Sequence, residues 1–182
     1  TRGVNVSPQN DAGAFVDVLK VGLGDIDLSA DEKTLYVINL YDKKLYAIDV
    51  ATKTLSGTYT IPTTGCTNGQ ARPFAIGEHN GSMYVSVTCD GSSSGNPANL
   101  LDNSGVNNLR AKVYRLDGSS FTQVLDVPLN YPKEVPFFYS NGCNSVDRWK
   151  PWTDVLPATC EDGNIGYPTP LLTDIEFSDN GD

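Results

Sequence analysis

The stretch between Gly24 and Pro62 constrains the fold of this chain more than any other feature. Apolar and polar residues alternate there with a period of two, which places successive side chains on opposite faces of a β-strand. Turns of two to five residues separate the alternating segments, and such short turns join antiparallel neighbours. We therefore expect a four-stranded antiparallel meander that needs similar neighbours to cover its faces. Its expected strands are residues 25–29, 34–40, 44–50 and 56–61.

A second meander is expected between Arg72 and Pro128. The dipeptide Asn80-Gly81, a strong hairpin signal, separates its first two strands. An insertion rich in glycine, serine and asparagine, residues 90–109, interrupts the pattern after the second strand and predicts a surface loop. The expected strands are residues 72–77, 82–88, 111–116 and 121–128.

Residues 29–39, SADEKTLYVIN, and residues 45–49, LYAID, resemble the YVTN-type β-propeller repeat. Glu32 stands where that repeat has a turn glycine. The resemblance implies an all-β fold of antiparallel four-stranded propeller blades, with one blade at 24–62 and another at 72–128. It implies little about function, because propellers serve as enzymes, adhesins and scaffolds alike.

Two flanking segments predict parts of further blades. Residues 14–21 alternate, and we interpret them as the outermost strand of a preceding blade. Residues 172–178 predict the first strand of a blade that begins within 171–182, because residues 173–178 align with 24–29. About two full blades with partial flanking blades make an incomplete propeller, since a closed ring typically needs about 4–8. We expect the chain to be a section of a longer protein, with the remaining blades supplied by the same or another chain.

The cysteines indicate the cellular compartment in which the protein is found. The four cysteines include no C-x-x-C pair, which argues against zinc and favours two disulfides formed in an oxidising compartment. Of the three pairings, we favour Cys66–Cys89 and Cys143–Cys160, because each pair lies within one local unit; free buried thiols are the alternative. The predicted location is extracellular or at the cell surface.

The charge and the hydropathy of the sequence exclude two classes of partner. A net charge of −9 argues against nucleic acid, which binds clustered lysine and arginine. No apolar run approaches the length of a membrane span, so we expect no membrane insertion.

The long connection 130–170 holds both tryptophans and is too aromatic for a flexible linker. Two interpretations of its rings are open: they form a small core beneath the segment, or some face outward and bind a protein or glycan partner. In the second interpretation, the run Arg148-Trp149-Lys150-Pro151-Trp152 places cations beside rings for stacking and cation–π contacts. The candidate ligand surface comprises Phe137, Phe138, Tyr139, Arg148, Trp149 and Trp152.

No catalytic motif occurs in the sequence, and its single histidine, His79, lies in an expected turn. We therefore assign no catalytic residue and no cofactor. Calcium is the alternative, because carboxylate-rich loops suit this ion, but aspartates at strand ends and turns commonly accept backbone hydrogen bonds instead. The weak candidates for a metal site are Asp25, Asp27 and Asp31.

The leading functional hypothesis is a non-catalytic module of a secreted or cell-surface protein, acting in adhesion, binding or assembly. One alternative is part of a propeller enzyme (a lyase, hydrolase or dehydrogenase) with its active site mostly on other blades. Another is a structural repeat of an extracellular fibre or surface layer. Polar residues at the first strands bear on the enzyme alternative: they are Asp25, Asp27, Arg72, Glu78, Asp174 and Glu176.

Overall fold

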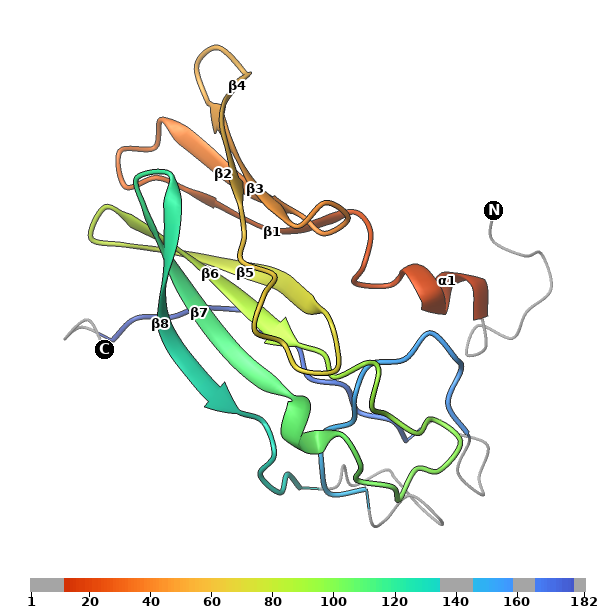
Figure 1. Cartoon of the computed structure of the whole chain (residues 1–182). Coiled ribbons are helices and arrows are strands. Elements are labelled where there is room, and N and C mark those ends of the chain that lie inside the picture. The colour runs from red at the N-terminus through yellow and green to blue at the C-terminus, as the bar shows by residue number, and fades with distance from the viewer. Residues whose placement is uncertain (1–11, 135–145, 159–165, 179–182) are drawn as a thin grey trace.

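The computed structural model describes residues 12–134, 146–158 and 166–178, and in these ranges the protein is almost entirely β (Figure 1). The first sheet contains four antiparallel strands that pair in chain order. It confirms the first predicted meander, because each strand begins and ends within two residues of the expected bounds. The strands are β1 (Leu23–Leu28), β2 (Thr34–Asn39), β3 (Lys44–Asp49) and β4 (Thr54–Thr60).

The second sheet also pairs in chain order and confirms the second predicted meander. Residues 90–109 leave the sheet between its second and third strands and include a short 3₁₀ helix, η1 (Val106–Asn108). The strands are β5 (Ala71–His79), β6 (Ser82–Cys89), β7 (Arg110–Asp117) and β8 (Ser120–Pro128).

The two sheets share one register, including an irregularity at the same place in the first strand. In β1 the pairing with β2 shifts between Leu23 and Ile26, and in β5 the pairing with β6 shifts between Pro73 and Ile76. Ile26 then pairs with Val37, and Ile76 with Val85. A bulge of this kind bends its strand and re-aims the side chains beside it. The match gives each residue of the first sheet an equivalent position in the second.

The main core lies between the facing sides of the two sheets. Aliphatic side chains from β2 and β3 meet aliphatic side chains from β5 and β6, and β1 runs beside β5. This face-to-face contact removes most of the apolar surface from water and supplies the main favourable energy of folding. The most deeply buried members are Ile38, Leu45, Ile61, Val85 and Val87.

The predicted strand at residues 14–21 is wrong. Residues Ala12–Asp17 form a short helix, α1, and no described strand pairs with the residues that follow it. Phe15, Val18 and Leu19 share an i, i+3, i+4 spacing, which suits one face of a helix as well as the alternation suits a strand. These three side chains pack toward Trp152 in the structure.

Residues 172–178 were predicted to form a first strand and are not a strand in the structure. They nevertheless lie against the second sheet: Leu172 accepts a hydrogen bond from the Ser86 hydroxyl at 3.1 Å, and its N–H donates to Thr88 at 3.2 Å. A strand needs a hydrogen-bonded neighbour, and no described segment pairs with this one.

The predicted disulfide Cys66–Cys89 is confirmed. It ties the connection between the two sheets to the end of β6. Cys143 and Cys160 lie outside the described residues, so their pairing stays a prediction.

Glu32, at the turn between β1 and β2, adopts a φ of 59°. This left-handed conformation is costly for a residue with a Cβ and easy for glycine. We expect Glu32→Gly to raise the free energy of unfolding by up to about 1 kcal/mol, measured by urea denaturation. The matched control is Lys33→Gly, next in the same turn but without a positive φ. An equal or larger gain from the control would contradict this explanation.

Candidate functional site

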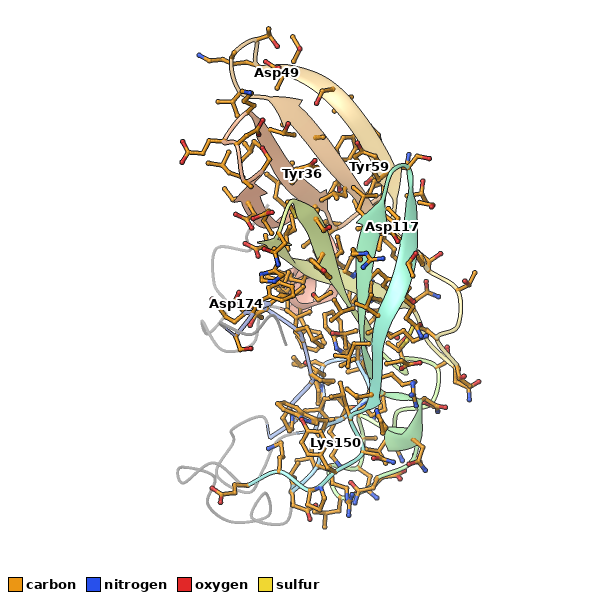
Figure 2. The ribbon with its side chains drawn as sticks, turned by 90° about the vertical axis from the view of Figure 1, so that its left-hand side faces the viewer. Tyr36, Asp49, Tyr59, Asp117, Lys150 and Asp174 are labelled. Carbon is orange, nitrogen blue, oxygen red and sulfur yellow. A yellow bond between two sulfur atoms is a disulfide. The ribbon has the colours of Figure 1, made fainter. Side chains whose placement is uncertain are left out.

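The first strands of the two sheets form the wall of a polar cleft. β1 lies beside β5 on one side, and residues 172–178 lie beside β5 on the other, where Ile175 approaches the α-carbon of Gly77. A side chain at position 77 would meet the backbone oxygen of Ile175 at 3.0 Å, so glycine permits this approach. Figure 2 shows Asp174 beside the hairpin of β5 and β6.

Asp25 joins β1 to β5 through both oxygens of its carboxylate. Oδ1 accepts a hydrogen bond from the N–H of Ile26 at 2.9 Å. Oδ2 accepts one from the N–H of Ile76, in the next sheet, at 3.1 Å. A carboxylate that accepts backbone N–H groups makes stronger hydrogen bonds than a neutral acceptor does.

Asp27 repeats the arrangement two residues further along β1. Its Oδ1 accepts from the N–H of Leu28 at 2.8 Å, and its Oδ2 accepts from the N–H of Glu78 at 3.0 Å. The positions of β5 equivalent to Asp25 and Asp27 are Ala75 and Gly77, which have no acceptor in the side chain. The β5 backbone therefore relies on the aspartates of β1.

Asp174 makes the first half of the same arrangement. Its Oδ1 accepts from the N–H of Ile175 at 2.8 Å, as Asp25 does from Ile26. The predicted alignment of 173–178 with 24–29 is therefore reproduced in this local hydrogen bond, although the segment is not a strand.

The cleft between these segments has a volume of about 450 Å³. His79 stacks on Phe177 at its rim, with 4.3 Å between ring centroids and 14° between planes. Its described lining contains no lysine or arginine, so its electrostatic potential favours cations. The acidic residues of this lining, named the axial carboxylates below, are Asp25, Asp27, Glu78, Asp174 and Glu176.

The oxygens of the axial carboxylates are largely committed to the backbone. Glu78 also accepts from the N–H of Gly81 at 2.6 Å. In the described ranges, no three histidine, cysteine, aspartate or glutamate side chains are arranged to hold a metal ion. The carboxylates thus serve mainly as hydrogen-bond acceptors for the backbone of their own and neighbouring strands. The acidic lining also attracts cations weakly into the cleft.

Of the three weak metal candidates, Asp25 and Asp27 come together in the cleft, and Asp31 lies in the turn after β1. The Ser29 hydroxyl donates to Asp31 at 2.7 Å, and the Lys33 N–H donates at 3.2 Å. These hydrogen bonds, the hydroxyl first, hold the pKa of the Asp31 carboxyl below its ordinary value. Asp31 therefore has a role within its own turn.

The aromatic segment is anchored by residues that the sequence offered as a ligand surface. Trp152 is only 4% exposed, and its indole N–H donates to the backbone oxygen of Pro170 at 2.8 Å. Lys150 is 1% exposed, and its ammonium donates to the backbone oxygen of Asp102 and to Asn103, both at 2.9 Å. Both side chains therefore hold the segment in place, and Figure 2 shows Lys150 among the side chains of this lower part of the molecule.

A buried ion pair lies beneath Trp152. The Arg72 guanidinium donates to the buried Asp90 carboxylate at 2.7 Å and stands 5.4 Å from the centre of the Trp152 ring. Asp90 also accepts from the N–H groups of Gln70 and Ser92, so its charge is well satisfied. Arg72 thus points away from the cleft. The sequence pattern did not indicate this cluster, because Asp90 and Trp152 are 62 positions apart.

The other members of the predicted ligand surface have different positions. Arg148 and Trp149 are half-buried, and Lys133 lies 5.5 Å from the centre of the Trp149 ring. Phe137, Phe138 and Tyr139 lie outside the described residues, so their role stays a prediction.

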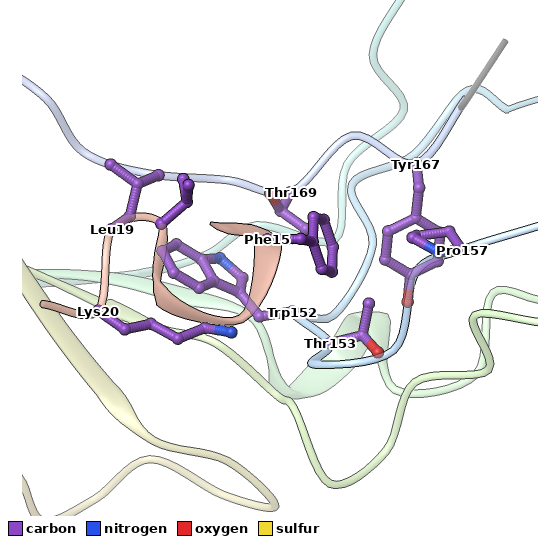
Figure 3. A pocket seen from close by; sticks show the side chains of 9 residues that line it. Phe15, Leu19, Lys20, Trp152, Thr153, Pro157, Tyr167 and Thr169 are labelled. Carbon is purple, nitrogen blue, oxygen red and sulfur yellow. The ribbon is translucent and has the colours of Figure 1, made fainter. Parts of the chain in front are cut away.

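A small apolar hollow separates α1 from the aromatic segment (Figure 3). Phe15 and Leu19 line one side, with Trp152, Pro157 and Tyr167 opposite, in a volume of about 100 Å³. Lys20 closes one edge through an ion pair with Asp154. The hollow is too small for most ligands.

Comparison with known proteins gives distant relatives only, and no family model matches the sequence. Colossin-A of Dictyostelium discoideum is 26% identical over an aligned length of 187 residues, and the alignment covers 98% of this chain and 2% of that protein. Colossin-B of the same organism is 28% identical over 173 residues, which cover 89% of this chain and 4% of that protein. The chain thus spans a small fraction of the length of both curated relatives.

The bridging role of Asp27 predicts a loss of stability in Asp27→Ala, because two backbone N–H groups lose their acceptor. We expect the free energy of unfolding to fall by about 1–3 kcal/mol, measured by urea denaturation. Glu176→Ala is the matched control, since it removes one carboxylate from the same cleft. Equal losses in both variants would contradict a specific stabilising role of the Asp27 bridge.

Burial, followed by the nearby charge of Asp102, raises the pKa of Tyr167 to about 12. A raised pKa contributes stability below the ordinary value of 10 and loses it as the pH rises through about 12. The hydroxyl of Tyr167 has no hydrogen-bond partner among the described residues. We therefore expect Tyr167→Phe to leave stability at neutral pH unchanged or higher and to reduce its loss between pH 10 and 12.

Ultraviolet absorbance of tyrosinate during an alkaline titration, together with thermal unfolding at each pH, measures both effects. Tyr41, which is 77% exposed, provides the control variant Tyr41→Phe. A clear loss of stability in Tyr167→Phe at neutral pH would mean that the hydroxyl has a partner after all.

Proposed function

We propose that the chain is a non-catalytic section of an extracellular or cell-surface β-propeller that serves in binding or assembly. The observation that carries the proposal is the repeated first-strand arrangement. β1, β5 and residues 172–178 follow one another along a single cleft, and at least one carboxylate on each of them accepts a backbone N–H group. Successive blades of a propeller line its central channel in this order.

The repeated register supports the propeller architecture. Two sheets with the same strand order and the same bulge pack face to face, as blades do, and β1 takes the innermost place in one and β5 in the other. Residues 172–178 then occupy the place of a third first strand.

The state of the polar groups supports a non-catalytic role. A general base or a nucleophile needs an oxygen or nitrogen that is available to the substrate. Both oxygens of Asp25 and of Asp27 accept backbone hydrogen bonds, and His79 is stacked on Phe177 and bonded to Asn80.

One observation supports the proposed location. Disulfides such as Cys66–Cys89 form and persist mainly in oxidising compartments. In the part of the chain that the structure describes, no helix has the length and hydropathy of a membrane span. The similarity of nearly the whole chain to a small part of each colossin supports its use as a module of a longer protein.

A second candidate, part of a propeller enzyme, is favoured by one feature. The axial carboxylates and His79 gather in one cleft without a compensating cation in its described lining. Such a cleft suits a cationic substrate, although the nucleophile would have to come from elsewhere.

The location is tested on intact cells of the source organism with an antibody against this chain and by differential alkylation of its cysteines. We expect the antibody to label the outside of the cells, and Cys66 and Cys89 to resist alkylation until a reductant is added. Detection only inside the cell, with both thiols free, would overturn the proposal.

Binding is tested by applying the labelled chain to a glycan array and to surface proteins extracted from the same cells. We expect binding that survives Glu176→Gln, a change confined to the cleft, and that weakens at least several-fold in Arg148→Ala. Loss of binding in Glu176→Gln alone would favour the enzyme candidate, with its site on the cleft.

A further inference from the structure

The first sheet has an apolar face that no described segment covers. It is the face turned away from the second sheet, and three of its side chains are more than half exposed: Leu23 at 66%, Ile26 at 57% and Leu55 at 59%. A hollow of about 310 Å³ on this face is lined mainly by apolar side chains, among them Leu23, Val37, Tyr46, Ile48 and Leu55. Exposed apolar surface of this extent marks a contact site.

The shared register of the two sheets shows how the equivalent face of the second sheet is covered. Five residues that line the hollow have equivalents that belong to, or pack against, the core between the two sheets. The second sheet therefore uses these positions to pack on the first sheet. The pairs are Val37 and Val85, Asn39 and Val87, Tyr46 and Tyr114, Ile48 and Leu116, and Leu55 and Phe121.

The exposures differ most at the bulge of the first strand. Ile26 is 57% exposed, whereas its equivalent Ile76 is 3% exposed because the first sheet covers it. The two isoleucines pair with equivalent valines, Val37 and Val85, on the second strand of each sheet. Ile76 lies in the core that the first sheet covers, and no described sheet covers Ile26.

We infer that the exposed face of β1–β4 docks a further four-stranded antiparallel sheet of the same repeat. This sheet covers β1–β4 as β1–β4 covers β5–β8, with aliphatic side chains at the positions equivalent to Ile38, Leu40 and Leu45. The inference rests on the propeller architecture of the proposed function, and on neither its location nor its lack of catalysis.

The backbone hydrogen bonds define one further property of this partner. The N–H groups of Ile26 and Leu28 already donate to Asp25 and Asp27, so β1 needs no acceptor from a neighbour. The N–H of Ile175 donates to Asp174 in the same way, and the neighbouring strand of Ile175, β5, has a glycine, Gly77, at the point of contact. The docking sheet stands in the same relation to β1 as β5 does to residues 172–178. We therefore expect a small residue in the docking sheet at the position equivalent to Gly77.

A second copy of this chain does not fit as the covering sheet. In a head-to-tail stack, β1 of one copy would take the place beside β5 of the other. Residues 172–178 already occupy that place through Ser86, Thr88 and Gly77. The partner is therefore a separate sheet.

Hydroxyl-radical footprinting tests the inference by comparing this 182-residue chain with the protein as its source organism makes it. We expect labelling of Ile26 and Leu55 to fall about fivefold or more in the natural protein, because burial such as that of Ile76 removes nearly all exposure. Val50 and Tyr41, exposed outside this face, serve as controls and should be labelled equally in both. Equal labelling of Ile26 and Leu55 in both proteins would overturn the inference.

A charged variant provides the second measurement. Leu55→Lys should leave the melting temperature of the 182-residue chain unchanged, because the side chain is 59% exposed, and lower that of the natural protein by several degrees. Val50→Lys should change neither.

Sedimentation of the 182-residue chain tests whether a second copy of the chain, rather than a separate sheet, docks on this face. Dimers that dissociate in Leu55→Lys, with Ile26 protected in the dimer as in the natural protein, would identify a second copy and overturn the inference. An intracellular location of the protein would contradict the proposed function and leave these results unaffected.

Discussion

The contact between β1 and β5 determines how the two sheets lie against each other. Apolar packing supplies most of its energy, but such packing is non-directional and does not by itself set how far one sheet slides along the other. Asp25 and Asp27 set this position, because their spacing along β1 matches that of the N–H groups of Ile76 and Glu78 along β5. A slip by one residue of one sheet along the other would break both bridges.

A second polar cluster holds the long insertions against this framework. Arg72, near the start of β5, and Asp90, just after the end of β6, lie at the open end of the β5–β6 hairpin and form an ion pair beneath Trp152. Lys150 caps the backbone of the 90–109 insertion. Buried charges of this kind cost much desolvation energy and contribute little net stability even when fully paired, but losing one partner is severe. The aromatic segment is therefore tied to the second sheet by a few specific polar groups, together with a small apolar cluster against which Trp149 packs.

The strands of both sheets could be predicted from sequence because their period-2 alternation is local and short turns separate them. The same rule failed at residues 14–21, where the apolar spacing suits a helix equally and only Trp152, far along the chain, decides the outcome. The alignment of residues 173–178 with 24–29 placed Asp174 at the position of Asp25, yet the use of both Asp25 oxygens depends on a neighbouring sheet and could not be predicted. Trp152 and Lys150 looked like surface groups because their partners, Arg72 and Asp102, are distant in sequence.

The Cys66–Cys89 disulfide has a mechanical consequence. If tension is applied along the chain, β1–β4 can be drawn out to its full length, but the covalent link bypasses the 23-residue interval that contains β5 and nearly all of β6. That interval would otherwise add about 80 Å of contour length. β5, the strand that carries the donor side of the inter-sheet contact, is thus shielded from extension, and a stretched molecule keeps a folded remnant on which the first sheet can reassemble when the force is released.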